Sequence, residues 1–196
     1  HGVSLTMMRL AIVAFIYGGL AAIVQDNLYR LISYTSVSHF GFMVLGIFGG
    51  SIAGASGAMV YMVAHGLSIA GLYLISGFLV RRTGTARLSE MGGIARVSPV
   101  IAGTFLFSAL ASIALPGLSG FVPEWLVLTG TFSVSTAAGL FALLGVVIAA
   151  LYALWPYQKV FTGAPKEKYV GIGDLNKSEK LLVTPLLIAM LALGLF

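Results

Sequence analysis

The chain has 196 residues, of which 59% are hydrophobic and only 9% are charged, and its mean hydropathy is +1.02. A water-soluble domain of this composition would have too few polar side chains to cover its surface, so an ordinary soluble protein is excluded. The formal net charge of +5 does not indicate a nucleic-acid partner, because the basic residues are scattered in short connections and form no basic face. The composition instead indicates that a lipid bilayer surrounds the chain.

The residue types also exclude several kinds of chemistry. The sequence contains no cysteine, which excludes thiol catalysis, iron–sulfur ligation and disulfides within it. It shows no phosphate-binding glycine loop, metal-ligand cluster or nucleophile motif, so we expect neither a cofactor nor a metal in this chain. The chain starts without an initiator Met or a charged leader, which indicates an internal segment of a longer protein.

The apolar runs are continuous, which favours helices over membrane strands, and about 20 such residues cross the hydrocarbon as a helix. We therefore predict an all-α fold, a polytopic transmembrane helix bundle forming one domain over residues 1–196. The predicted spans lie near residues 5–24, 31–48, 57–80, 99–115, 121–158 and 181–196. The run at 121–158 is broken into two, because its first apolar stretch would be only roughly 18 Å long as a helix.

The charges of two connections predict the topology. Residues 81–98 carry four arginines against one glutamate, which predicts a cytoplasmic position by the positive-inside rule. The connection at 159–180 carries five lysines against three acids. We favour two crossings between residues 121 and 160, which place this second connection outside; a single crossing, which its charge prefers, would place it inside.

Two histidines lie inside predicted spans. His39 lies near the middle of the second span, with Thr35 on the same helix face one turn earlier and Ser38 beside it. Such an imidazole can pass a proton near neutral pH, or it can be a neutral histidine that hydrogen-bonds to a neighbouring helix. His65 lies in the third span close to glycines, where helix packing explains it as well as a proton path does.

Glu124 is the most expensive ionisable residue if it lies deep in the membrane, and proton carriers exploit that cost. The alternative is structural, because Pro123 suits the first position of a helix and an acid in the first turn interacts favourably with the helix dipole. Lys159 closes an apolar run, so its side chain either reaches the membrane surface or takes part in a proton relay. The sequence leaves these alternatives open.

Three sequence blocks carry a resemblance to a known family. They are RLISYTSVSHFGF at residues 30–42, AHGLSIAGL at 64–72 and LPGLSGFVPEW at 115–125. Together they resemble the antiporter-like subunits of NADH:quinone oxidoreductase, respiratory complex I, and among these the chain M type, the counterpart of mitochondrial chain 4. The resemblance extends over nearly the whole segment.

The resemblance implies an antiporter-like fold of about fourteen helices in two inverted repeats. This segment would be a fragment covering most of the second inverted repeat, with a discontinuous helix around residues 121–135. The resemblance further implies that Glu124 ends an internal proton path and that His39 and His65 lie on its hydrated axis. The possible relay residues are Lys159, Thr35 and Ser38.

One position departs from the family pattern. Such subunits usually carry a lysine directly before the Arg-Leu-Ile run, and this chain has Tyr29 there. A central cation is therefore missing where the family pattern expects one. If the path is active, His39, a nearby polar residue or a lysine outside this segment must replace its electrostatic effect.

By this resemblance the chain is a non-redox, proton-translocating membrane subunit that couples quinone reduction elsewhere in the complex to proton pumping. NADH, FMN, iron–sulfur clusters and quinone would be bound by other subunits, and the partners would be the other membrane-arm subunits and the lipid bilayer. A bacterial plasma membrane is favoured over the mitochondrial inner membrane. Two alternatives remain open: a subunit of a multisubunit sodium/proton antiporter, and a structural membrane-arm spacer, which Tyr29 slightly favours.

Overall fold

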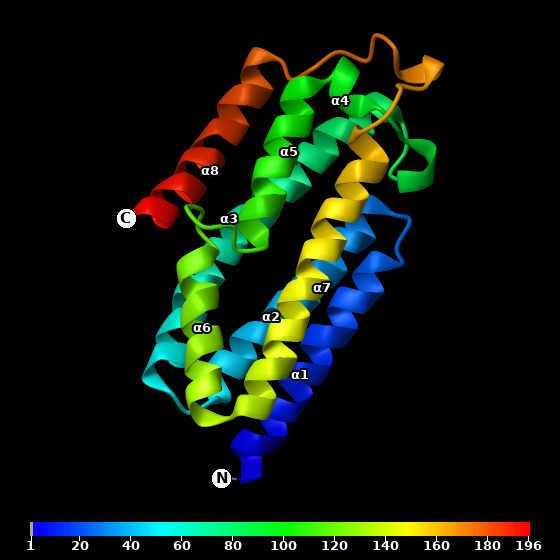
Figure 1. The fold of residues 1–196 in the computed structure, drawn as a ribbon. Coiled ribbons are helices and arrows are strands. Elements are labelled where there is room, and N and C mark those ends of the chain that lie inside the picture. Colours follow the sequence, from blue (N-terminus) through cyan, green and yellow to red (C-terminus); the bar gives the residue numbers. More distant parts are fainter. Residues whose placement is uncertain (1) are drawn as a thin grey trace.

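The structure, a computed structural model, describes residues 2–196 as a bundle of helices (Figure 1). The helices are α1 (Gly2–Ile23), α2 (Leu28–Phe48), α3 (Ile52–Thr83), α4 (Ile94–Val97), α5 (Pro99–Ser112), α6 (Phe121–Val134), α7 (Thr136–Phe161) and α8 (Lys177–Leu195). Two 3-10 turns lie in the connections, η1 (Leu88–Glu90) and η2 (Glu167–Tyr169). Five helices, α1, α2, α3, α7 and α8, are long and apolar enough to cross a membrane. The predicted all-α membrane fold is confirmed.

Side chains that accept hydrogen bonds from the first backbone N–H groups define where the long helices begin. The Asn27 side chain accepts from two backbone N–H groups of α2, Ser51 accepts from α3, and Ser135 accepts from α7. At the start of α8, Asn176 and Glu179 form a reciprocal capping box. Because Ser51 caps α3, this helix begins at residue 52, ahead of the predicted residue 57.

Helices α1 and α2 are packed closely enough for their backbones to touch. A Cβ atom on Gly41 of α2 would lie 2.6 Å from the backbone nitrogen of Phe15 in α1, so only glycine fits there. The hydroxyl of Ser38 donates to the carbonyl of Phe15 at 2.7 Å. This contact holds α2 in one register against α1.

A discontinuous crossing is formed by α5 and α6, which have 14 residues each. Each half is about 21 Å long, short of the ~30 Å hydrocarbon. The two halves lie one after the other along α3: Gly71 of α3 faces Ser108 of α5, and Gly57 of α3 faces Leu126 of α6. Figure 1 shows α5 above α6, with the connection between them near the middle of the bundle.

The position of the break corrects the predicted topology. The predicted division of residues 121–158 into two helices is found, at Ser135, but the interruption within one crossing lies earlier, at residues 113–120, because Pro116 and the glycines of this segment end α5 before it has crossed. Ala114 has a φ of 61° and Gly117 a φ of 91°, both in the left-handed region. A non-glycine residue such as Ala114 is strained in this region, and strained residues cluster at functional sites.

The connections at residues 84–98 and 162–176 lie at the same end of the bundle. The prediction of two full crossings between residues 121 and 160, which placed them at opposite ends, is therefore wrong. The α6 half completes the crossing that α5 begins, and α7 returns (Figure 1). The backbone N–H of Gly93 donates to the carbonyl of Thr162 at 2.9 Å, and the Ser98 hydroxyl donates to the carbonyl of Gly173 at 2.6 Å. The structure therefore agrees with the alternative that the charge of residues 159–180 favoured, in which this connection lies on the same side as residues 81–98. We call this end, with residues 84–98 and 162–176, the loop end.

Candidate functional site

Four side chains from four helices form a hydrogen-bonded chain inside the bundle. The hydroxyl of Tyr152 (α7) lies 2.9 Å from Nε2 of His39 (α2). The other ring nitrogen of His39, Nδ1, lies 2.8 Å from the hydroxyl of Tyr61 (α3), which donates to Oε2 of Glu124 (α6) at 3.0 Å. We call Tyr152, His39, Tyr61 and Glu124 the buried polar chain.

The helix positions of these residues explain why they meet. His39 lies on the buried face of α2, and Glu124 lies in the first turn of α6, where the break brings a helix start into the interior. All four side chains are excluded from solvent, and the most exposed of them, Glu124, is only 7% exposed. Their hydrogen bonds are therefore protected from competition with water, and each polar group depends on its neighbours for a partner.

The protonation state of Glu124 sets the direction of every hydrogen bond in the buried polar chain. When the Glu124 carboxylate accepts from Tyr61, the Tyr61 oxygen is free to accept from His39 Nδ1–H. A neutral imidazole then has its lone pair on Nε2, which accepts from Tyr152. If Glu124 is protonated instead, every bond can reverse. The two states therefore use the same heavy-atom positions and differ by one proton, which is taken up at the Tyr152 end and leaves Glu124 protonated.

His65 lies beside the buried polar chain without being hydrogen-bonded to it. Its ring centroid is 4.9 Å from that of His39, and its side chain is 5% exposed. Within residues 2–196, neither ring nitrogen of His65 has a hydrogen-bond partner. A buried polar group without a partner costs stability, so His65 is a residue for which packing alone gives no explanation.

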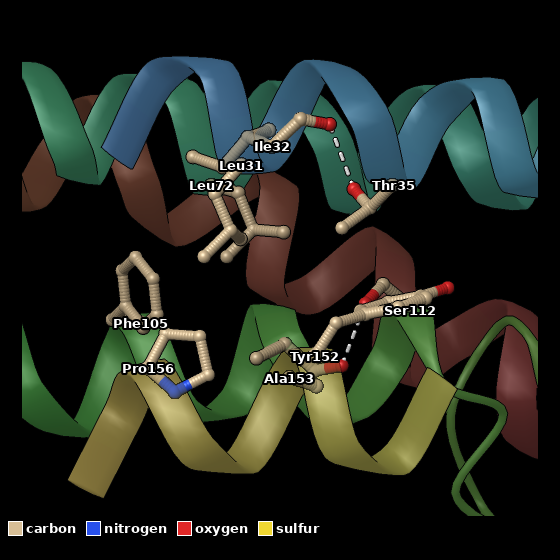
Figure 2. Close-up of a pocket in the computed structure, with 10 residues that line it drawn as sticks. Leu31, Ile32, Thr35, Leu72, Phe105, Ser112, Tyr152, Ala153 and Pro156 are labelled. Carbon is tan, nitrogen blue, oxygen red and sulfur yellow. Dashed lines mark hydrogen bonds between the residues drawn. The ribbon is translucent and has the colours of Figure 1, made fainter. Parts of the chain in front are cut away.

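The predicted relay residues lie at different places. Thr35 lies one turn before His39 on the same face, and its hydroxyl donates to the carbonyl of Ile32 at 2.7 Å. Ser38 donates to α1 and so belongs to the contact between α1 and α2. Tyr29 lies in the first turn of α2, where its ring stacks on that of Tyr73 with the centroids 6.2 Å apart. Thr35 lines a pocket together with Tyr152 (Figure 2), and the Ser38 hydroxyl lies beside the Tyr152 side chain, so both residues border the buried polar chain.

Lys159 lies near the loop end, away from the buried polar chain. Its Nζ is 3.6 Å from Oδ1 of Asp26 and 5.8 Å from the centre of the Trp155 ring. Hydrogen bonds from Ser89, together with the positive charge of Lys159, hold the pKa of the Asp26 carboxyl below its usual value. This ion pair forms a charged patch close to the start of α2.

The two tyrosines of the buried polar chain were not among the residues predicted from the sequence. Tyr61 precedes His65 by four positions and so shares its helix face, which is a signal that the sequence does contain. Tyr152 has no polar residue one turn away on α7. Only the packing of α7 against α2 reveals its contact with His39.

Glu124 opens onto a pocket beside the break. The pocket has a volume of about 140 Å³ and is lined by Ala114 on the break and by Trp125 and Leu128 on α6. Glu124 thus belongs both to the buried polar chain and to the lining of this pocket. Within residues 2–196, no group of three or more His, Cys, Asp or Glu side chains is placed to hold a metal ion.

Comparison with known proteins gives consistent matches. Residues 2–150 match the family described as NADH:quinone oxidoreductase/Mrp antiporter, TM. The chain is 46% identical over 190 residues to NADH-quinone oxidoreductase subunit M of Mycobacterium tuberculosis, covering 97% of this chain and 34% of that protein. It therefore spans about a third of the length of this curated relative.

Solved structures share the same fold. A chain of respiratory complex I from Thermus thermophilus with bound NADH superposes with a TM-score of 0.94 at 33% identity, covering 100% of this chain and 41% of that chain. A chain of the Mrp complex from Dietzia sp. DQ12-45-1b gives a TM-score of 0.89 at 20% identity, covering 98% of this chain and 44% of that chain. The second likeness, at this identity, is one of fold alone.

Proposed function

Because the chain belongs to the NADH:quinone oxidoreductase/Mrp antiporter transmembrane family, we propose that it is part of a proton-translocating membrane subunit of NADH:quinone oxidoreductase. In this proposal the buried polar chain is the segment of the proton path that this part of the subunit supplies. The observation that carries the proposal is the unbroken sequence of hydrogen bonds from Tyr152 through His39 and Tyr61 to Glu124.

The proton moves along these groups by successive transfers. A proton taken up by the Tyr152 oxygen allows Tyr152 to give its own proton to Nε2 of His39. The imidazole then releases its Nδ1 proton to Tyr61, which passes its hydroxyl proton to the Glu124 carboxylate. Each transfer uses a hydrogen bond of ordinary length, so no side chain has to move far. Glu124 then holds the proton beside the pocket at the break.

The driving force comes from outside the chain. Redox chemistry elsewhere in the assembly changes the charge or hydration near Glu124 and so the affinity of the buried polar chain for a proton. Moving one charge against 100 mV costs about 2.3 kcal/mol. An electrostatic change of that size is comparable to the coupling free energies that are ordinary in allosteric proteins. Within the proposal this chain binds no redox cofactor, and electrons do not pass through it.

The partners and the location follow from the same proposal. The chain lies among the other membrane-arm subunits and lipid in a bacterial plasma membrane, a location supported by its likeness to proteins of Mycobacterium tuberculosis and Thermus thermophilus. The alternative of a sodium/proton antiporter subunit rests on a fold shared with the Mrp complex at 20% identity. The 46% identity to subunit M of the oxidoreductase favours the first proposal.

The proposal is tested with Glu124→Gln in the full-length subunit, assembled in the whole complex and reconstituted into sealed vesicles. Glutamine keeps the shape of the side chain and removes its ability to carry a proton. We expect fewer protons pumped per electron pair, or a coupled loss of pumping and quinone reduction, in a complex that still assembles. Glu167→Gln is the matched control, because Glu167 lies exposed in the loop-end connection.

Normal pumping and normal quinone reduction in the Glu124→Gln complex would contradict the proposal and favour a structural spacer. Loss of both activities in the Glu167→Gln complex as well would show that the change acts through assembly. Quinone reduction that continues at the normal rate with reduced pumping is the most specific positive result, because it separates proton transfer from electron transfer.

A further inference from the structure

A pocket with two arginines lies at the loop end, where the turn between α1 and α2 meets the connection after α3. It has a volume of about 290 Å³ and is lined by Gln25, Asp26, Asn27, Arg30 and Arg87. Two backbone hydrogen bonds join the segments: the N–H of Leu28 donates to the carbonyl of Ala86 at 2.8 Å, and the N–H of Leu88 donates to the carbonyl of Asp26 at 2.7 Å. We call this the arginine pocket.

The arginines of this pocket are only weakly neutralised by neighbouring acids. Within the part of the chain that the structure describes, the Arg30 side chain makes no ion pair. Arg87 lies 3.9 Å from Glu90 in an exposed pair, and such pairs contribute little. Asp26, the one acid in the wall, already accepts from the backbone N–H and the hydroxyl of Ser89. The arginine pocket therefore keeps an excess of positive charge.

The arginine pocket lies in the most positive part of the molecule. The chain has eleven basic and six acidic residues, and all except Arg9 and Glu124 lie at or beside the loop end, where basic side chains exceed acidic ones by five. By the positive-inside rule this end faces the cytoplasm. The cytoplasmic leaflet carries anionic lipids, and basic pockets between helices on that side bind their head groups.

An apolar groove between α1 and α2 lies farther into the membrane. It has a volume of about 310 Å³ and is lined by Met7, Leu10, Ala11 and Ala14 of α1 and by Val37, Phe40, Gly41 and Val44 of α2. The two helices lie side by side (Figure 1) and touch at Gly41, so the small residues form the floor of the groove. Phe40 is 55% exposed, so the groove is open to the surroundings of the bundle.

The arginine pocket and the groove lie on the same face of α2. Val37 and Val44 follow Arg30 by seven and fourteen residues, close to two and four helical turns. At 1.5 Å per residue, the two valines lie about 10 and 21 Å from Arg30 along the helix. The hydrocarbon of one leaflet is about 15 Å thick. An acyl chain whose head group sits at Arg30 therefore reaches the groove.

We propose that Arg30 and Arg87 bind the phosphate of an anionic phospholipid whose acyl chain lies in the groove between α1 and α2. Guanidinium groups bind phosphate oxygens through paired hydrogen bonds. The Asn27 side-chain oxygen accepts from the backbone of α2, which leaves its NH₂ group to donate to the same phosphate. Positive charge at one end and an apolar groove at acyl-chain distance together fit a lipid. The inference goes beyond the proposed function, because this site shares no residue with the buried polar chain.

The test compares the binding of phosphatidylglycerol and phosphatidylcholine to the purified native assembly that contains the full-length subunit, after its own lipids have been exchanged. Native mass spectrometry counts the lipids that stay bound. Each basic residue near an anionic head group contributes about fivefold to binding, so Arg30→Gln/Arg87→Gln should weaken phosphatidylglycerol binding at this site roughly 30-fold. The assembly should then retain one phosphatidylglycerol fewer.

Arg81→Gln/Arg96→Gln is the matched control, because it removes the same charge from exposed arginines outside the arginine pocket. Retention of phosphatidylcholine should be unchanged in both double variants. If Arg30→Gln/Arg87→Gln does not assemble, Arg30→Gln alone takes its place, with an expected loss of about fivefold.

The groove is tested separately with Ala14→Leu, which fills its floor and leaves the charge of the arginine pocket unchanged. We expect the same loss of one phosphatidylglycerol. Ala70→Leu is the control, because Ala70 is exposed on α3 outside the groove. A high-resolution map of the wild-type assembly should show phosphate density between Arg30 and Arg87, continuous with a chain along Val37 and Val44.

Several results would overturn the lipid site. Unchanged phosphatidylglycerol retention in the Arg30→Gln/Arg87→Gln assembly would remove the role of the arginines. Unchanged retention in the Ala14→Leu assembly would mean that no acyl chain occupies the groove, as when the arginines bind only a free phosphate ion. A map with polypeptide in the groove, from the rest of the subunit or from a neighbouring chain, would also overturn the proposal. None of these readouts depends on proton pumping, so the proposed function stands or falls independently.

Discussion

Tyr61 provides the sharpest test of the buried polar chain, because its one hydroxyl group joins the two groups of greatest interest. The hydroxyl lies 2.8 Å from His39 Nδ1 and 3.0 Å from Glu124 Oε2. Tyr61→Phe removes this single oxygen and keeps the ring, which is 2% exposed and packs against Phe42 with ring centroids 5.8 Å apart. The histidine and the glutamate are then too far apart to exchange a proton directly.

The Tyr61 hydroxyl is both a buried hydrogen-bond partner and a proposed proton carrier, so its removal should affect both stability and the pumping rate. Leaving a buried polar group without its partner costs about 1–3 kcal/mol, and this substitution affects both His39 and Glu124. Glu124 can turn toward the pocket at the break, so we expect the cost at the lower end of that range. The functional loss should be larger, since a positioned proton-transfer group contributes about 10²–10⁴-fold to a rate.

The assay is proton pumping together with quinone reduction in vesicles that contain the assembled Tyr61→Phe complex. Tyr17→Phe is the matched control, because Tyr17 is 61% exposed on α1 and lies outside the buried polar chain. Pumping at the wild-type rate in the Tyr61→Phe complex would refute the claim that protons cross from His39 to Glu124 through this hydroxyl, whatever the outcome for Glu124→Gln.

Two further predictions concern stability, measured as thermal unfolding of the purified complex. Gly41→Ala should destabilise the subunit by about 1–3 kcal/mol, because the new Cβ would lie 2.6 Å from the backbone of Phe15. Gly103→Ala is the control and should be neutral or stabilising, because its new Cβ meets no atom within 4 Å. Equal losses of stability in the two variants would contradict this reasoning. The lowered pKa of Asp26 means that its hydrogen bonds with Ser89 stabilise the fold above the unfolded-state pKa of about 3.9 and that this contribution is lost as the pH falls through the folded-state value. Ser89→Ala should therefore lower stability near pH 7 and have a smaller effect below pH ~4, and a pH-independent difference would count against this account.

Family membership and the principal candidate residues could be inferred from the sequence. His39 and Glu124 stand out because polar ionisable groups are rare in apolar helices, and the structure places both in one hydrogen-bonded chain. The roles proposed for them, and for His65, remain predictions. Lys159 shows the limit of the same reasoning, because a lysine at the end of an apolar run looks alike whether it faces the interior or pairs with Asp26 at the surface.

The break in the discontinuous helix shows a different limit. A proline and several glycines mark residues 113–120 as a possible end of a helix, but they do not show whether the preceding run has already crossed the membrane. That depends on where α5 and α6 pack along α3, in contacts such as Gly71 with Ser108 and Gly57 with Leu126, which are 37 and 69 positions apart in the chain. The same packing decides that residues 84–98 and 162–176 share one end of the bundle.

The sequence by itself determined the solvent of this protein, the number and approximate limits of its apolar helices, and the few costly polar groups inside them. These properties are local, because they depend on the hydrophobicity of about 20 consecutive residues and on the cost of burying a single side chain. Only the tertiary structure decided that Tyr61 and Tyr152 hydrogen-bond to the two ring nitrogens of His39 and so complete the buried polar chain. A hydrogen bond between helices depends on their rotation and register to within a fraction of an ångström, and these are set by close packing over the whole bundle.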